Sequence, residues 1–186
     1  TPESVASAAT DPVANVNDLP VGTVTISGTA EEDQTLTASN DLSDEDGLGT
    51  ISYQWQRDGA DIDGATGETY TLGQADVGAA ITVVASYTDA QGTPESVASA
   101  ATDPVANVND APELVVPSDA AVAEFAATGS VVTTIAATDE DEDTLIFTML
   151  DDAGGRFAFA DTSSGQIIVN DGLALDFEQQ GSHDVI

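Results

Sequence analysis

The chain has 186 residues, and its 34 acidic side chains face only two basic ones, which gives a formal net charge of −32 at pH 7. Nucleic acid is excluded as a partner because phosphate contacts need lysine and arginine, and no apolar run is long enough for membrane insertion. The absence of cysteine excludes disulfides, thiolate metal sites and cysteine nucleophiles.

The first eighteen residues, TPESVASAATDPVANVND, are repeated without change at 93–110. An identical duplication at a domain-sized spacing indicates tandem repeats. The sequences diverge after each copy, so we interpret the copy as the last strand and exit linker of one type of domain. Residues 1–18 then close a preceding repeat of a longer polypeptide, and we expect 1–12 to have no partner strand within its own chain. The alternative is an Ala/Ser/Thr linker used twice.

The stretch 19–106 predicts one complete domain. It contains short segments with alternating polarity that are rich in Val, Ile, Thr and Tyr, and turn residues separate them. The segments read TVTISG, QTLTAS, ISYQWQ, ETYTL and AITVVASYT. Regularly spaced short strands of this kind indicate an all-β sandwich.

Within this domain, ISYQWQRDG and ADVGAAITVVASYTD resemble segments of an immunoglobulin-like (Ig-like) fold. Trp55 stands where that family has its core tryptophan, and Leu36 and Val83 stand near its usual cysteine positions. The resemblance implies that packing alone closes the core and that Trp55 is buried. It is strongest to the Ig-like repeats of very large bacterial surface adhesins.

The remainder, a linker at 107–112 and a second domain at 113–186, resembles a cadherin repeat. Five motifs occur in the family's order: NVNDAP, VAEFAATGSVV, AATDEDED, FAFADTSSGQIIV and LALDFE. The resemblance implies a second, C-terminally incomplete β-sandwich and a calcium-binding linker. Asn107 and Ala111 depart from the linker pattern of the family.

Calcium needs six to eight oxygen ligands, and no single loop of this chain supplies that number. In a sandwich, alternate loops share one end, so we predict Ca²⁺ sites assembled from several loops at three places. The central set is Glu32, Asp76, Asn107, Asn109, Asp110, Asp139 and Asp141. The N-terminal set is Asn17, Asp18, Asp44, Asp46 and Asp89. The resemblance to a cadherin repeat implies the C-terminal set, Glu124, Asp176 and Glu178. We expect them to fill in the order central, N-terminal, C-terminal.

Two explanations of these acidic residues do not involve calcium. Acidic loops are commonly only solvated, and Asp76 in ADVG also suits a purely structural role at an Ig-type corner.

The predicted function is a calcium-stiffened stalk segment of a large extracellular bacterial adhesin, of the kind used at the cell surface in cell adhesion and biofilm formation. Expected partners are neighbouring repeats of the same polypeptide, with strand exchange or homophilic contact between chains. We predict no enzymatic activity. A catalytic triad would need the only histidine, His183, in a cleft with Ser and Asp, and we expect it at the surface. Calcium explains the paired carboxylates better than glycoside hydrolysis does, and no Gly-rich phosphate loop is present. Direct recognition of a glycan or protein, and an accessory module of an extracellular hydrolase, are the alternatives.

Overall fold

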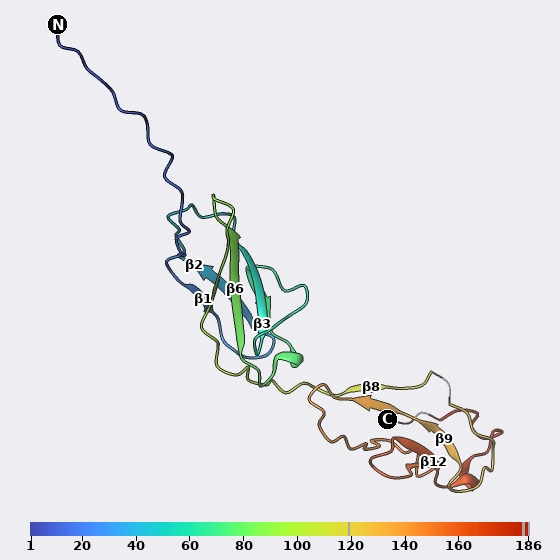
Figure 1. The fold of residues 1–186 in the computed structure, drawn as a ribbon. Helices are drawn as coiled ribbons and strands as arrows, with labels where there is room; N and C mark the ends of the chain where they lie inside the picture. Colours follow the sequence, from blue (N-terminus) through green and yellow to red (C-terminus); the bar gives the residue numbers. More distant parts are fainter. Residues whose placement is uncertain (119, 184, 186) are drawn as a thin grey trace. The chain divides into compact units, whose positions relative to one another are not determined.

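The computed structural model describes residues 1–118, 120–183 and 185. The chain divides into two compact units, Thr1–Val108 and Asn109–Ile186. In the described residues the regular structure consists of β-strands and two short 3₁₀ turns, with no α-helix (Figure 1). This confirms the predicted all-β class.

The first unit contains two antiparallel sheets. One has the order β1-β2-β5 and is formed by β1 (Val24–Ser27), β2 (Thr35–Asn40) and β5 (Thr69–Thr71). The other has the order β4-β3-β6-β7 and is formed by β3 (Ser52–Arg57), β4 (Ala60–Asp61), β6 (Ile81–Thr88) and β7 (Pro94–Ala98). A 3₁₀ turn, η1 (Gln74–Asp76), precedes β6.

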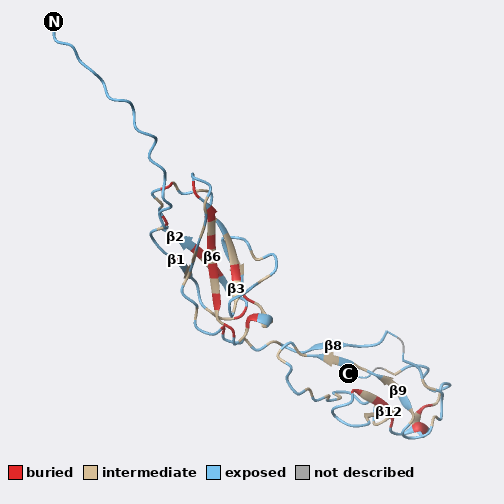
Figure 2. Ribbon diagram, in the orientation of Figure 1, coloured by how far each residue is buried: buried red, intermediate tan, exposed pale blue. Residues whose placement is uncertain are grey.

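Both sheets contribute to one core, which makes this unit a sandwich. Strand β6 alternates buried and half-buried residues over ITVVASY, as the period of two of a β-strand requires. Its buried side chains pack in the same cluster as those of β2 and β1 (Figure 2). The cluster's buried members are Val24, Leu36, Ala38, Leu42, Trp55, Leu72, Ile81, Val83, Ala85, Tyr87 and Val105.

Trp55 lies at the centre of this core and is fully buried, as predicted. Its ring stacks on Tyr70 with 5.7 Å between centroids, and its indole nitrogen donates to the carbonyl of Gly67 at 2.9 Å. Leu36 and Val83 are also fully buried. Apolar packing therefore closes the core without a disulfide.

The two copies of the duplicated sequence have different structures. In the second copy, Pro94–Ala98 forms β7 and pairs with β6 in antiparallel register. In the first copy, residues 1–18 are exposed and form no strand. Among the described residues, 1–12 therefore pairs with no strand of its own chain.

The second unit has a two-stranded and a three-stranded sheet. The first pairs β8 (Glu113–Val115) with β10 (Ala136–Thr138). The second has the order β11-β12-β9, from β9 (Val131–Thr134), β11 (Phe157–Phe159) and β12 (Gln166–Val169). A 3₁₀ turn, η2 (Gly172–Ala174), follows β12. Among the described residues, the core of this unit is smaller and has four buried members: Phe157, Ile167, Val169 and Leu175.

Candidate metal centres

In the first unit, the sequence Asp44-Glu45-Asp46 lies in the loop between β2 and β3 and holds the end of the first NVND motif. The Asp46 amide donates to Asp44 Oδ1 at 2.8 Å, and the Asp18 amide donates to Asp46 Oδ2 at 2.7 Å. Tyr87 of β6 donates its hydroxyl to Asp44 Oδ2 at 2.6 Å. Desolvation and the hydrogen bond to Asp44 raise the pKa of Tyr87, so this hydroxyl stays a donor.

Asp89 lies in the loop after β6 and adjoins the same region. Its Oδ1 accepts from the amides of Gln91 at 2.9 Å and Thr93 at 2.7 Å, while its Oδ2 is buried without a partner. Desolvation raises the pKa of Asp89, but the amide hydrogen bonds outweigh it and the net shift is downward. The result is a buried, charged carboxylate with one oxygen free for a cation.

A glycine lets the two loops meet. Gly47 follows Asp46 with a φ of +99°, and a Cβ at this position would lie 2.9 Å from the Cβ of Ala90. The Ala90 amide also donates to the carbonyl of Asp46 at 3.2 Å. Any residue other than glycine would push the loops of Asp46 and Asp89 apart.

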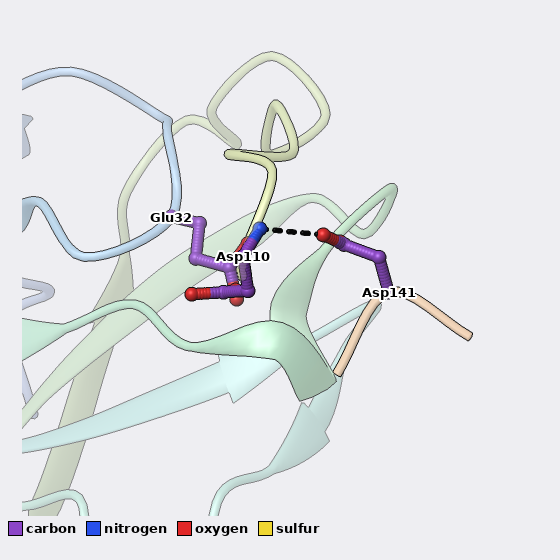
Figure 3. A group of neighbouring side chains, drawn as sticks. All are labelled: Glu32, Asp110 and Asp141. Atoms are coloured by element: carbon purple, nitrogen blue, oxygen red, sulfur yellow. Dashed lines mark hydrogen bonds between the residues drawn. The ribbon is translucent and has the colours of Figure 1, made fainter. Parts of the chain in front are cut away.

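In the second unit, Asp139-Glu140-Asp141 after β10 repeats this arrangement. The Asp141 amide donates to Asp139 Oδ1 at 3.1 Å, and the Asp110 amide donates to Asp141 Oδ2 at 2.7 Å, as Figure 3 shows. Asp141 Oδ1 is buried without a partner. In both units, therefore, the last residue of an NVND motif donates its amide to the second aspartate of Asp-Glu-Asp.

At the other end of the first unit, Glu32, which Figure 3 also draws, holds the segment that leaves the domain. Its amide donates to the carbonyl of Ala106 at 2.9 Å, and its Oε2 accepts from the amide of Val108 at 3.2 Å. Glu32 is only 2% exposed. A buried glutamate thus fixes the chain up to Val108.

Asp76 is engaged by protein donors on both oxygens. Arg57 approaches Asp76 Oδ1 with Nε and Nη2, both at 2.7 Å. Tyr70 and the Gly73 amide donate to Oδ2 at 2.8 and 3.0 Å, and the hydrogen bond to Asp76 raises the pKa of Arg57. These contacts match the structural alternative for Asp76, and we build the proposed calcium site without it.

The predicted C-terminal set comes together within the second unit. Glu124, Asp176 and Glu178 each offer a carboxylate oxygen, and the three oxygens lie within 4.8 Å of one another. The Gln179 side chain and the Glu178 amide donate to Asp176 and lower its pKa. Three carboxylates at this spacing repel one another unless a cation lies among them.

The three asparagines predicted as calcium ligands differ in their surroundings. Asn17 Nδ2 donates to Glu95 Oε1 at 2.8 Å, and Asn109 Nδ2 donates to the carbonyl of Asp110 at 2.9 Å. Asn107 is exposed. Each asparagine still has a side-chain oxygen that suits calcium.

Sequence reasoning did not single out Tyr87, Tyr70 or Arg57, which position the carboxylates of Asp44 and Asp76. For Tyr87 a signal exists, because it lies at a buried position of β6 two residues before Asp89. His183 is half-buried and meets Phe157 edge-on, with 6.1 Å between ring centroids. It therefore packs on the small core of its unit rather than lying free at the surface.

No protein-family model and no curated protein matches the sequence. Among solved structures, the chain is similar to the extracellular cadherin domains 1-5 and 3-6 of Protocadherin Gamma B2 and to the EC3-6 cis-dimer structure of protocadherin gammaB7. The identities are 18%, 18% and 17%, with TM-scores of 0.41, 0.41 and 0.34. These similarities cover 90%, 89% and 87% of this chain. The chain spans 36%, 45% and 45% of those proteins' chains.

In the described part of the chain, no helix has the length and apolar character needed to cross a membrane.

Proposed function

We propose that this chain is an extender segment of a large extracellular bacterial adhesin, and that Ca²⁺ binding at its NVND motifs stiffens it. The proposal rests on the surroundings of the Asp141 carboxylate. One of its oxygens holds the Asp110 amide, and the other is buried with no partner. Burying an unpaired charged oxygen is costly, and a bound calcium ion supplies the missing partner.

The ligand chemistry supports calcium over other metals. The candidate ligands Asp110, Asp139 and Asp141 are carboxylates, and the chain has no cysteine. Hard oxygen donors suit Ca²⁺ and Mg²⁺, and calcium accepts the irregular, flexible geometry of loops from several elements. The free Oδ2 of Asp89 in the first unit and the cluster of Glu124, Asp176 and Glu178 in the second offer further sites of the same kind.

The stiffening follows from the connectivity of the chain. Glu32 fixes the chain at Val108, and Asp141 fixes it at Asp110, so one residue, Asn109, separates the two attachments. An ion held by Asp110, Asp139 and Asp141 would restrict the remaining rotations of the NVND motif. A stalk built from such repeats would hold a binding module away from the cell.

The test is a calcium titration of the full chain by calorimetry, with Asp141→Asn compared with Asp143→Asn. Asp143 lies in the same loop and contributes its backbone amide to Asp139, so its side chain is the matched control. We expect millimolar or tighter binding, as in other extracellular modules at about 0.1–1 mM. Asp141→Asn should weaken the affinity of its site at least about tenfold, the loss expected when a group that holds or orients a metal is removed, and Asp143→Asn should not.

Small-angle scattering with and without calcium measures the stiffening itself. The ion should narrow the distribution of distances between the units in the unmodified chain and not in Asp141→Asn. The proposal would be contradicted if no calcium bound up to about 10 mM, a concentration well above the dissociation constants typical of extracellular modules. Equal binding by the unmodified chain and Asp141→Asn would contradict it as well.

A further inference from the structure

Two segments that are far apart in the sequence lie side by side where the chain leaves the first unit. Ala106 donates its amide to the carbonyl of Ala30, and its carbonyl accepts from the amide of Glu32, both at 2.9 Å. The bridge between Ala106 and Glu31 is parallel. The chain that follows β1 and the chain that leaves the unit therefore run in the same direction where they meet.

The leaving segment is bonded on its other side as well. The carbonyl of Val105 accepts from the amide of Gly78 at 2.9 Å, and its amide donates to the carbonyl of Ala79 at 3.0 Å. Its bridge to Val77 is also parallel, and its side chain, only 3% exposed, belongs to the core. Two consecutive residues thus make four backbone hydrogen bonds to two different parts of the unit.

The chain enters the first unit at the opposite end from this contact (Figure 1). Val21, just before β1, exchanges two backbone hydrogen bonds of 2.8 Å with Ser43, which follows β2. From this entry the chain runs through β1 to Glu31, where the leaving segment passes it in the same direction. Tension on the two ends of the unit therefore pulls the first segment backward and the last segment forward, so that each is made to slide along the other.

Sliding is the direction in which this contact resists best. Hydrogen bonds between strands lie across the strand direction, so sliding stretches the bonds of residues 105 and 106 together, whereas pulling two strands apart from one end breaks them one after another. Glu32 adds a fifth bond, because its Oε2 accepts from the amide of Val108 at 3.2 Å. Forced unfolding is governed by the rate of unfolding, and that rate falls when several bonds must break in one step.

We propose that residues 105–108, held between 30–32 and 77–79, form a mechanical clamp that keeps the first unit folded when the chain is under tension. The inference rests on the proposed function, because a stalk segment is a protein that transmits force between its two ends. The clamp lies where the chain leaves the unit, so force reaches it before it reaches the core. It consists of backbone donors, carbonyls and one glutamate of the unit itself, and it therefore acts without calcium.

The experiment is single-molecule force spectroscopy of the full chain in chelator, with handles attached through introduced cysteines. The chain has no cysteine of its own, so each pair of attachment points is unique. Val13→Cys with Ala111→Cys pulls the first unit from end to end. Gln34→Cys with Ala111→Cys pulls at the exit end only, which peels the clamp open. All three positions are exposed.

We expect the folded first unit to survive at least about tenfold longer, at equal tension, when it is pulled from end to end. Joint loss of one or two hydrogen bonds contributes a factor of this size to a rate. Ala106→Pro removes the donor to Ala30 and should shorten the end-to-end lifetime roughly tenfold. Ala101→Pro is the matched control, since the Ala101 amide has no hydrogen-bond partner among the described residues.

Three results would overturn the proposal. Equal lifetimes in the two pulling directions would show that the parallel contact does not resist sliding, and this comparison holds even if Ala106→Pro does not fold. Equal lifetimes of Ala106→Pro and Ala101→Pro would place the barrier elsewhere. A larger loss for Val21→Pro than for Ala106→Pro would place it at the entry. Because calcium is absent throughout, none of these results depends on the calcium titration, and failure of that titration leaves them standing.

Discussion

Among single residues, the buried carboxylates separate into two kinds. Asp76 has a protein donor for each oxygen, whereas Asp89 and Asp141 each leave one buried oxygen without a partner. An ion pair or a hydrogen bond offsets the cost of taking a carboxylate out of water, and an unpaired oxygen retains that cost. The first kind therefore stabilises the fold, and the second suits a cation.

Replacing Trp55 with Ala should lower the free energy of unfolding of the first unit by about 3–5 kcal/mol, because a large buried side chain leaves a cavity. The loss includes the stack on Tyr70 and the hydrogen bond to Gly67. Urea unfolding followed by circular dichroism measures it, and Leu48→Ala at a 42% exposed position is the control. A loss below about 1 kcal/mol would contradict the central position of Trp55.

Replacing Asp76 with Asn should destabilise the first unit by about 1–3 kcal/mol, because Arg57 loses its charged partner. The affinity for calcium should stay unchanged if Asp76 has only a structural role. Chemical unfolding and calorimetry are the two measurements, and Asp61→Asn, an exposed position, is the control. Loss of calcium binding with stability intact would instead identify Asp76 as a ligand.

At the scale of elements, the loops carry the chemistry and the strands set their positions. The Asp-Glu-Asp loops follow β2 in the first unit and β10 in the second, and each binds the last amide of an NVND motif. Because the donor is a backbone amide, this contact does not depend on which side chain the residue carries. It depends on the conformation of the loop that accepts it. The aspartate-to-amide bonds inside each loop fix that conformation.

The cluster of Glu124, Asp176 and Glu178 predicts an effect that changes sign with calcium. Without calcium, Glu178→Gln removes one of three repelling charges and should raise the stability of the second unit by a few tenths of a kcal/mol, as for other exposed charge pairs. With several millimolar calcium, the same change should lower it through loss of a ligand.

Thermal melting in chelator and in calcium measures both signs, with Glu113→Gln in β8 as the control. An identical shift in the two conditions would show that the cluster binds no calcium.

For the whole molecule, a net charge of −32 is the dominant electrostatic fact. Like charges spread over a folded chain repel one another, and unfolding moves them apart. Salt screens exposed charges over a Debye length of about 8–10 Å at 0.1–0.15 M. Cations must therefore stabilise the folded chain by screening its charge, in addition to any effect of binding at a specific site.

The melting temperature should rise from low salt to about 1 M NaCl, where the Debye length falls to about 3 Å. At equal ionic strength, calcium should raise it more than magnesium, because Mg²⁺ dehydrates reluctantly and demands regular octahedral geometry. Differential scanning calorimetry of the full chain makes the comparison. Equal effects of the two ions would indicate screening without a specific site.

Local pattern determined much of the fold. The alternation in ITVVASYT specifies which face of β6 is buried, because side chains on a strand point to opposite faces in turn. Val83 belongs to this pattern, whereas the buried positions of Trp55 and Leu36 were expected from the resemblance of their segments to an Ig-like fold. The Asp-Glu-Asp and NVND motifs are likewise local, so the sequence identified both parts of each contact before their geometry was known.

Only the tertiary structure decided what depends on partners distant in the chain. Asp76 pairs with Arg57, nineteen residues away, and nothing in ADVG specifies that pairing. The duplicated eighteen residues make the point most directly, since the same letters form β7 at 94–98 and no strand at 2–6. The second copy follows β6 after a short turn and pairs with it, whereas the first copy pairs with no strand among the described residues. An isolated strand leaves its backbone groups without partners, so the neighbour, and not the sequence of the copy, decides whether it becomes a strand.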